Sequence, residues 1–427
     1  MKIRQLELKN FRCFDQTTFE FSDQFNVLIG DNGKGKTAFI EALVIIVGTF
    51  LSRFTGVYEP NIFISKSRIQ YSDIREVRNE RVEYVFPVEI FCKAIINEVE
   101  IDWSNSLRKI HNAHARSLSP ITFADNLRIQ VEQDKTTDLP LMAYYGTSRL
   151  WGVKKTPQEL DNMKKSPVRQ NRFWGYTDSL EPRSNLILDW FRFEDVQILL
   201  GQESFMIHEA ISNALATCAI DKWTSMNYDA NEDTLVVRSL DGKSQQFVKL
   251  SDGIKNMIGM VADIAYRAAV LNPHLETDAP KETQGVVLID EIDLHLHPNW
   301  QRRVVDDLKR TFPKIQFFAT THSPFIIQSL HPNELIDLDH RDGEYYNKSI
   351  EDIAEDVMGV DLPQQSERWK SMMQAAEEYY RVLEQAESAS EEEVDRLKRR
   401  LDELSMPYSD DPAYHAFLKM ERLARGL

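Results

Sequence analysis

The sequence feature that most constrains the fold is a glycine-rich segment between an apolar run and a helix-forming run. Residues 25–29 are apolar and β-branched enough for a buried strand, and residues 38–46 are long enough for a helix. Between them lies the pattern G-x-x-x-x-G-K-[ST], the phosphate-binding P-loop. Its members are Gly30, Asp31, Asn32, Gly33, Lys34, Gly35, Lys36 and Thr37. The pattern predicts a nucleotide phosphate site in which Lys36 reaches the β- and γ-phosphates and Thr37 offers its hydroxyl to Mg²⁺.

The bulk composition narrows the class of protein and its partners. The 427 residues allow two or three domains, or one large α/β domain with insertions, and a hydrophobic fraction of 42% is enough for a sizeable core. The formal net charge of −16 argues against a surface that binds nucleic acid throughout, although a local basic groove is compatible with it. Three scattered cysteines without a C-x-x-C pair are typical of a reducing cytosol.

No targeting or membrane segment is expected from the sequence. Residues 1–8 alternate like a strand and lack the apolar core of a signal peptide. The longest apolar stretch, residues 39–51, is too short to span a bilayer and falls in the helix expected after the P-loop. These features predict a cytoplasmic protein with no membrane partner.

Apolar runs and helical patterns alternate along most of the chain, which predicts an α/β fold. A strand meander is expected over 2–29, two antiparallel strands over 83–102, a hairpin over 234–250, and helices over 253–271 and 299–311. Continuous apolar strands form a parallel or mixed sheet that helices cover on both faces. Such strands are expected over 25–29, 139–146, 286–290, 315–321 and 335–338.

Two segments differ in composition from the rest of the chain. Residues 149–183 carry eight basic against four acidic residues, with four aromatic residues among them. This pattern fits a nucleic-acid groove and, equally, a solvated loop. Two helices are expected after it, over 185–200 and 203–220. Residues 375–404 combine dense charge with helical periodicity and predict a helical hairpin, which is either a protein–protein surface or a plain solvated helix pair.

An apolar strand ends in two adjacent carboxylates, Asp290 and Glu291. Ligands bind at the carboxyl ends of the strands in open α/β sheets. Asp290 is expected to hold Mg²⁺ beside Thr37, and Glu291 to accept a proton from an attacking water. The alternative is a charged strand end that only begins a loop, and the presence of a P-loop in the same chain favours the catalytic interpretation.

Two further segments fit a nucleotide site but have structural alternatives. Ser251 and the backbone of Gly253 precede a helix and could donate hydrogen bonds to a phosphate. Serine is also a common N-cap, which needs no ligand. His322 follows an apolar strand and could bond a γ-phosphate, whereas a purely structural histidine is the commoner case.

These segments, in this order after a P-loop, resemble the ATP-binding cassette heads of the SMC, RecF and overcoming-lysogenization-defect group. Residues 10–14 are similar to the group's Asn-Phe-Arg segment, which puts Arg12 near the nucleotide. Residues 250–255 match the signature motif, Asp293 lies in the D-loop, and His322 corresponds to the switch histidine. The resemblance implies an ABC-type ATPase head, a mixed sheet with flanking helices plus an antiparallel β subdomain, that uses ATP and Mg²⁺.

The resemblance also implies an assembly. Heads of this group dimerise, and each ATP lies between the P-loop of one chain and Ser251–Gly253 of the other. A homodimer is therefore expected, with higher oligomers left open.

The chain departs from the group in several respects. It has no zinc hook, no Toprim or H-N-H nuclease motif, and no Q-loop glutamine within residues 144–149. His295 and His297 alternate within the D-loop, which argues against a zinc site. The chain most resembles the ATPase subunit of Septu-type antiphage systems and related retron effector ATPases. That resemblance implies a separately encoded H-N-H nuclease as partner and no nuclease activity in this chain.

The chain is expected to divide into four segments. Residues 1–149 form the N-terminal part of the head with the P-loop, and residues 150–230 a basic loop with a helical lid. Residues 231–345 form the C-terminal part of the head, and residues 346–427 a helical region for assembly or partner binding.

Three functions follow from the sequence and stay open there. The first is an ATP-hydrolysing switch in an antiphage defence complex. The second is a regulatory module in which ATP restrains a nuclease with slow hydrolysis or none. The third is a RecF-like DNA repair ATPase that binds DNA through residues 149–183.

Overall fold

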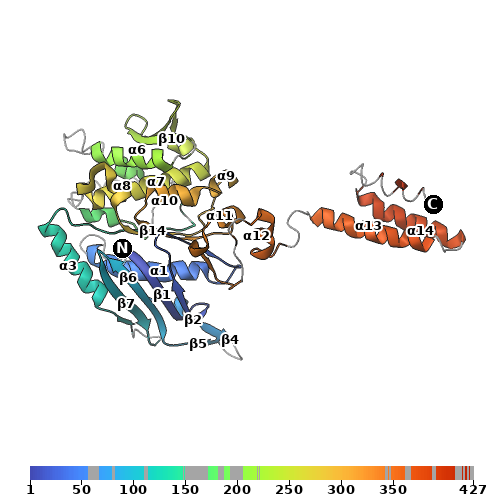
Figure 1. Cartoon of the computed structure of the whole chain (residues 1–427), viewed down its shortest axis with the longest axis horizontal. Coiled ribbons are helices and arrows are strands. Elements are labelled where there is room, and N and C mark those ends of the chain that lie inside the picture. Colours follow the sequence, from blue (N-terminus) through green and yellow to red (C-terminus); the bar gives the residue numbers. More distant parts are fainter. Residues whose placement is uncertain are drawn as a thin grey trace. The chain divides into compact units, whose positions relative to one another are not determined.

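The computed structural model separates the chain into two compact units, Met1–Ile353 and Ala354–Leu427 (Figure 1). The structure describes residues 1–55, 67–78, 82–109, 114–147, 149, 172–180, 187–192, 205–218, 220, 222–341, 345, 348–360, 367–386, 391–408, 416, 419, 420 and 423. The segment expected to form a basic loop falls mostly outside these residues, as does part of the helix expected over 185–200. Residues 187–192 of that helix are helical.

A five-stranded parallel sheet forms the centre of the first unit. Its strands lie in the order β15 (Leu335–Asp337), β3 (Phe25–Ile29), β14 (Ile315–Thr320), β13 (Gly285–Ile289) and β9 (Leu141–Tyr145), and every pairing among them is parallel. All residues of β3, β13 and β14 are buried, as the continuous apolar runs predicted. The carboxyl ends of all five strands therefore meet at one edge of the sheet.

A second, antiparallel sheet has the order β2 (Phe14–Glu20), β1 (Lys2–Phe11), β6 (Val88–Ile96), β7 (Val99–Leu107) and β8 (His114–Arg116). The predicted meander over residues 2–29 is wrong in its last step, because β3 leaves this sheet and joins the parallel one. The physical reason is burial: β3 has no exposed residue, whereas β2 and β7 keep exposed residues among their buried ones.

The helix after the P-loop, α1 (Lys36–Thr55), lies between the two sheets. It contacts β6 and β7 on one side and β13 and β14 on the other. Phe39 of α1 shows this directly, since its ring packs on Phe19 of β2 at 4.9 Å and lies 6.4 Å from Phe318 of β14. The helix is longer than the sequence predicted and is apolar enough to cross a membrane by length and composition. However, 78% of that apolar stretch is buried inside the chain, so α1 is a core helix.

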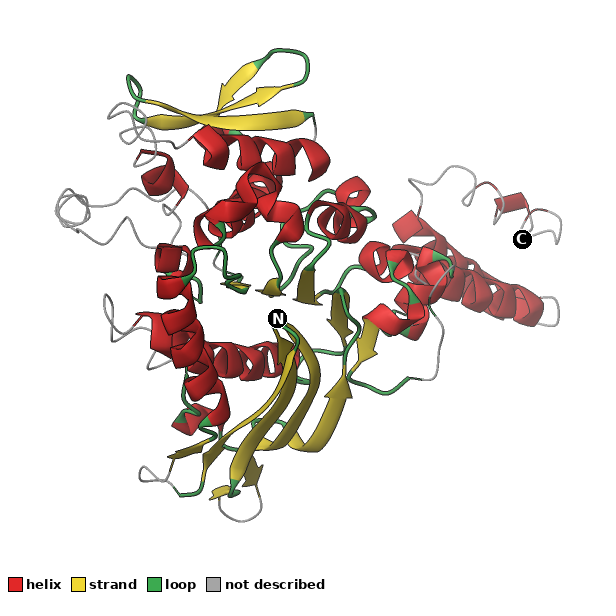
Figure 2. Cartoon of the chain, turned by 60° about the vertical axis from the view of Figure 1, so that its left-hand side comes forward, coloured by secondary structure: helices red, strands yellow, loops and turns green. Residues whose placement is uncertain are grey.

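The other face of the parallel sheet carries α7 (Asp252–Leu271), on which α6 (Phe205–Cys218) packs (Figure 2). A three-stranded sheet of β10 (Trp223–Asp229), β11 (Thr234–Ser239) and β12 (Ser244–Gln246) covers α6. The predicted hairpin thus gains a strand, and its second arm is shorter than expected because residues 247–249 form a 3-10 turn.

The helix predicted over 299–311 is wrong as a single element. The structure has α9 (Pro298–Gln301) and α10 (Val304–Thr311), interrupted at Arg303, whose φ of −126° is not helical. Further elements among the described residues of this unit are α3 (Ser119–Gln133), α8 (Ala279–Glu282), α11 (Pro324–Ser329), β4 (Glu76–Arg78) and β5 (Val82–Tyr84). The helix α12 (Ile350–Asp356) crosses the boundary between the two units.

The second unit contains the predicted helical hairpin, α13 (Glu367–Ala386) and α14 (Glu391–Ser405). Its core is small and consists of Ala376, Tyr379 and Val382 on α13, with Leu404 of α14 packed against them. The hairpin prediction is confirmed, and its role stays a prediction.

Candidate nucleotide-binding site

The predicted site residues gather at the carboxyl edge of the parallel sheet. The P-loop follows β3, Asp290 and Glu291 follow β13, and His322 follows β14. The register places the last residues of these strands level with one another, because Ile289 pairs with Ala319 and Leu28 pairs with Thr320. Burial lowers the pKa of Lys36, and the charges of four carboxylates oppose that fall: Asp339, Asp31, Asp290 and Glu291. The two nucleotide motifs therefore belong to one site.

The P-loop backbone adopts conformations that favour glycine. Gly30, Gly33 and Gly35 have φ values of +148°, +85° and +106°. A Cβ on Gly35 would lie 2.5 Å from the Sγ of Cys13, so the chain also needs glycine there for space. Lys36 Nζ donates to the carbonyls of Gly30 at 2.6 Å and Asp31 at 3.1 Å, which holds the side chain across the loop. Thr37 lies exposed in the first turn of α1, where N–H groups and the helix dipole favour an anion.

The P-loop is bound to the segment after β15, a contact that the sequence did not predict. Asp339 accepts hydrogen bonds from the backbone N–H of Asp31 and from Lys34 Nζ, both at 2.8 Å. Arg341 bridges Asp31 at 2.8 Å and Asp339 at 3.0 Å. No local pattern in the sequence signals this contact, because it forms only when β15 pairs with β3.

A threonine joins the side chain of Asp290 to the backbone of Glu291. Thr320 Oγ1 donates to Asp290 Oδ1 at 2.6 Å and accepts from the backbone N–H of Glu291 at 2.7 Å. Glu291 has a φ of +50°, an uncommon conformation for a residue with a Cβ. Asp290 is buried and Glu291 is partly exposed at the edge of the sheet. This arrangement suits a fixed metal ligand beside a base that solvent can reach.

Arg149 begins the basic segment that the sequence left open between a nucleic-acid groove and a solvated loop, and the two arginines of this segment that the structure describes make internal contacts. Arg149 is 6% exposed and donates to the carbonyls of Gly146, Asp290 and Glu291. Arg172 donates to the carbonyls of Leu271, Lys135 and Thr137. Both guanidinium groups therefore hold the fold together, and neither offers its donors to a phosphate backbone.

The D-loop touches both the switch histidine and the signature motif of the same chain. Asp293 Oδ1 accepts from Thr321 Oγ1 at 2.6 Å and from the backbone N–H of His322 at 3.4 Å. The side chain of His322 itself is exposed. On the other side, a Cβ on Gly253 would lie 2.3 Å from the carbonyl oxygen of His295. Gly253 is thus required by close packing whatever its role toward a nucleotide.

Ser251 occupies the N-cap position of α7 but makes no capping hydrogen bond with its side chain. It is exposed, and its backbone is extended, with φ −62° and ψ 153°. The simple N-cap alternative therefore does not account for the hydroxyl. Its predicted role toward a nucleotide stays a prediction.

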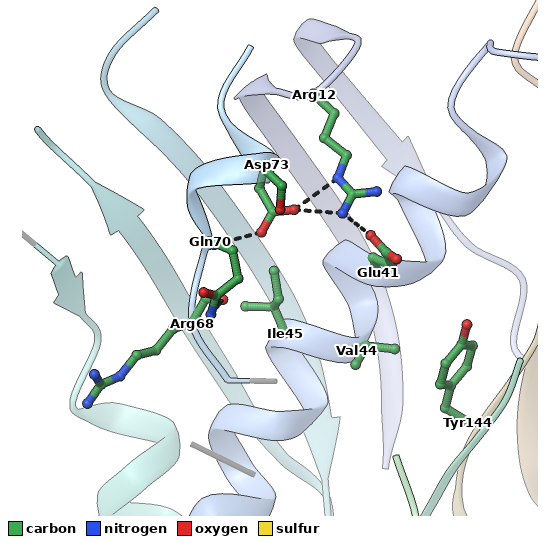
Figure 3. A pocket seen from close by; sticks show the side chains of 9 residues that line it. Arg12, Glu41, Val44, Ile45, Arg68, Gln70, Asp73 and Tyr144 are labelled. Atoms are coloured by element: carbon green, nitrogen blue, oxygen red, sulfur yellow. Dashed lines mark hydrogen bonds and ion pairs between the residues drawn. The ribbon is translucent and has the colours of Figure 1, made fainter. Parts of the chain in front are cut away.

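Arg12 lies in a sharply turned loop beside the P-loop, next to Cys13. Its Nε and Nη2 donate to Asp73 Oδ1 at 2.9 and 2.7 Å, and Nη2 also pairs with Glu41 of α1 (Figure 3). These residues line a cavity of about 260 Å³ together with Val44, Ile45, Arg68, Gln70, Ser72 and Tyr144. Both carboxylates hold the guanidinium on the α1 side of the loop, and direct contact with a nucleotide stays a prediction.

The residues present fit ATP and Mg²⁺. The N–H groups of the P-loop and Lys36 supply donors for phosphates. Hard oxygen ligands, the Thr37 hydroxyl and the Asp290 carboxylate, are those that Mg²⁺ prefers. Glu291 is the carboxylate at this edge that could accept a proton from water.

Comparison with known proteins identifies the family. Residues 25–328 match the model of the family described as AAA domain, putative AbiEii toxin, Type IV TA system. The Retron Ec83 probable ATPase of Escherichia coli is 46% identical over 395 residues, which cover 77% of this chain and 70% of the relative. The Retron Vc95 probable ATPase of Vibrio cholerae serotype O1 biovar El Tor is 25% identical over 389 residues, covering 78% and 73%.

A third relative shares a shorter segment. The Septu protein PtuA of Bacillus thuringiensis is 38% identical over 135 residues, which cover 27% of this chain and 32% of the relative. The family model spans the P-loop, the carboxylates and the switch histidine, and with them most of the parallel sheet. The chain therefore belongs to the family of AAA domains described as putative AbiEii toxin, Type IV TA system, and it is similar in sequence to retron probable ATPases and to the Septu protein PtuA.

Proposed function

We propose that this chain binds and hydrolyses ATP and acts as the switch subunit of an antiphage defence complex that controls a separately encoded nuclease of the H-N-H type. The observation that carries the proposal is the meeting of Lys36 and Thr37 with Asp290 and Glu291 at one edge of the parallel sheet. The retron and Septu relatives support the defence context. The proposed location is the cytoplasm.

The chemistry follows from the positions of these side chains. Lys36 and the P-loop amides neutralise charge on the phosphates. Thr37 and Asp290 would hold a Mg²⁺, which would supply positive charge next to the phosphates. Glu291 takes the proton of the attacking water. His322, exposed at the end of β14, contacts the γ-phosphate. Positioning and charge stabilisation supply most of the rate in phosphoryl transfer.

The active state proposed is a homodimer with ATP between the two heads. Ser251 and Gly253 stand at the start of α7, where an added Cβ on Gly253 would meet the backbone of His295. The first turn of a helix carries unpaired N–H groups, so a second chain can close over the phosphates with this turn. The helical hairpin α13–α14 then recruits the nuclease or joins dimers into a higher oligomer.

The test compares ATP turnover by the wild type, Glu291→Gln and Ser251→Arg, with light scattering for the oligomeric state. General bases contribute about 10²–10⁴-fold, so Glu291→Gln should retain ATP binding and lose most turnover. Ser251→Arg should bind ATP as a single chain and fail to dimerise. Equal turnover in the wild type and Glu291→Gln would refute the role given to Glu291.

The effect on the nuclease is tested with the product of the neighbouring reading frame. Nuclease activity is measured against ATP concentration, with and without Glu291→Gln. Activation that needs turnover supports the switch. Inhibition by ATP without turnover supports the alternative of a restraining module. Salt-dependent duplex binding by the wild type would instead support the DNA repair alternative.

A further inference from the structure

The structure assigns to Arg149 the role of a positioning residue for the catalytic carboxylate Glu291, an inference that rests on the proposed ATP hydrolysis. The described hydrogen bonds of Arg149 all go to backbone carbonyls. It acts on the backbone that carries Glu291.

The contacts of Arg149 converge on the turn after β13. Its Nη1 donates to the carbonyls of Asp290 and Gly146, the latter at 3.1 Å, and its Nη2 donates to the carbonyl of Glu291. The bonds to Asp290 and Glu291 join residues that lie 141 and 142 positions apart in the sequence. Arginine suits this task because its planar fork presents several donors in a fixed geometry, which lysine cannot reproduce.

The turn needs this support because Glu291 is held in a strained conformation. Its φ of +50° lies in the left-handed region, which a residue with a Cβ adopts only when its surroundings enforce it. The backbone of Glu291 is held from both ends, its N–H by Thr320 Oγ1 at 2.7 Å and its carbonyl by Arg149. The side chain is left without a described hydrogen bond in the part of the chain that the structure covers, so the backbone sets where the carboxylate points.

Burial explains why the guanidinium stays in place. Arg149 is 6% exposed, and the loss of solvent lowers its pKa while the charges of Asp290, Asp293 and Glu291 raise it again. An arginine remains protonated under any such shift at neutral pH. The group therefore combines full charge with fixed hydrogen bonds directly behind the two carboxylates.

The test measures kcat and KM for ATP in Arg149→Lys and Arg149→Gln. A misplaced catalytic group costs on the order of tenfold to a hundredfold, so kcat should fall by that factor. KM and the affinity for a fluorescent ATP analogue should stay close to wild type, because the P-loop is untouched. Arg172→Lys is the matched control: it also removes bonds from a guanidinium to three carbonyls, but away from the site, and should leave kcat unchanged.

Combination with Glu291→Gln separates positioning from general stability. Residues that act as one unit are not additive, so Arg149→Lys should lower turnover no further once Glu291 is already glutamine. Additive losses, or an unchanged kcat in folded Arg149 variants, would overturn the inference and leave the proposed function intact. Normal turnover in Glu291→Gln alone would instead remove the proposed function and the inference together.

A second pair of variants covers the case in which the Arg149 variants do not fold. Thr320→Val removes the hydroxyl that holds the N–H of Glu291, and Thr320→Ser keeps it. The expected result is a loss of kcat in Thr320→Val and near-complete rescue in Thr320→Ser. Equal kcat values in these two variants would show that catalysis does not require the backbone of Glu291 to be held by hydrogen bonds.

Discussion

The α-carbon of Gly253 lies so close to His295 that an added Cβ would come within 2.3 Å of the His295 carbonyl oxygen. The start of α7 and the D-loop are therefore packed backbone against backbone. This contact ties the segment proposed to close over a partner's nucleotide to the segment beside the switch histidine of its own chain.

We predict that Gly253→Ala reduces both stability and ATP turnover, because the clashing atom belongs to backbone that cannot rotate away. Overpacking costs about 1–3 kcal/mol, which should appear as a lower urea midpoint. Asp252→Ala is the control, since Asp252 is exposed in the same turn and pairs with Lys255. A Gly253→Ala protein with wild-type midpoint and turnover would show that the D-loop can move aside freely.

We predict that Asp339→Asn loosens the P-loop and weakens ATP binding. The carboxylate of Asp339 accepts a hydrogen bond from the backbone N–H of Asp31 and forms an ion pair with Lys34. Burial alone would raise the pKa of Asp339, but the bonds from Lys34 and Asp31 and the charge of Arg341 hold it below its usual value of 3.8. A carboxyl group whose pKa is lower in the folded than in the unfolded state stabilises the fold. This stabilisation is complete above the pKa of the unfolded state and is lost as the pH falls through the pKa of the folded state.

The difference in melting temperature between wild type and Asp339→Asn should therefore be constant from neutral pH down to the usual pKa of an aspartate side chain. It should shrink below about pH 4. Thermal melts at a series of pH values test this. A difference that grows as the pH falls would have the wrong sign for this explanation.

We predict that Arg267→Met destabilises the protein strongly. Arg267 pairs with Asp263 at 2.8 Å, their side chains are 1% and 0% exposed, and the Tyr145 hydroxyl donates to the same carboxylate at 2.5 Å. Removing one partner of a buried pair leaves the other charge uncompensated and costs about 3–5 kcal/mol. The free energy of unfolding in urea measures the loss.

Replacing both partners of this pair tests the same explanation. An Arg267→Met, Asp263→Leu double variant should be more stable than Arg267→Met alone, because no uncompensated charge remains. If the double variant is the less stable of the two, the uncompensated charge is not the cause.

We predict that ATP protects Cys13 from alkylation by N-ethylmaleimide. The Sγ of Cys13 lies 3.7 Å from the Lys34 carbonyl, and it is the exposed cysteine of the three, since Cys92 and Cys218 are buried. Burial raises the pKa of Cys13, so labelling should be slow at neutral pH and faster as pH rises. Mass spectrometry of the labelled peptide gives the rates. Equal rates with and without ATP would place the nucleotide away from this loop.

The sequence predicted those parts of the fold and of the candidate site that depend on neighbouring residues in the chain. The P-loop residues Gly30–Thr37 and the strand before Asp290 were predictable, since glycine placement and continuous apolar runs act within a few residues. The strand β10 was missed because Ser225, Asn227 and Asp229 break up its strand-favouring residues, and it forms by pairing with β11.

The supports of the site were not predictable, because they join distant residues. Arg149 was assigned to a basic loop from its neighbours in sequence, whereas its contacts with Asp290 and Glu291 exist only after β9 pairs with β13. The bond between Asp31 and Asp339 likewise depends on β15 lying beside β3. Charge composition alone could not separate such internal arginines from surface ones.

The position of α1 between the two sheets means that the proposed phosphate site shares a wall with the antiparallel sheet. Phe39 fills the space between Phe19 and Phe318, only a few residues beyond Thr37. Any molecule that binds the outer face of the antiparallel sheet and shifts β2 would therefore press on α1, the helix whose first turn is proposed to receive the phosphates. ATP affinity in this protein should report on events at a surface that no nucleotide touches.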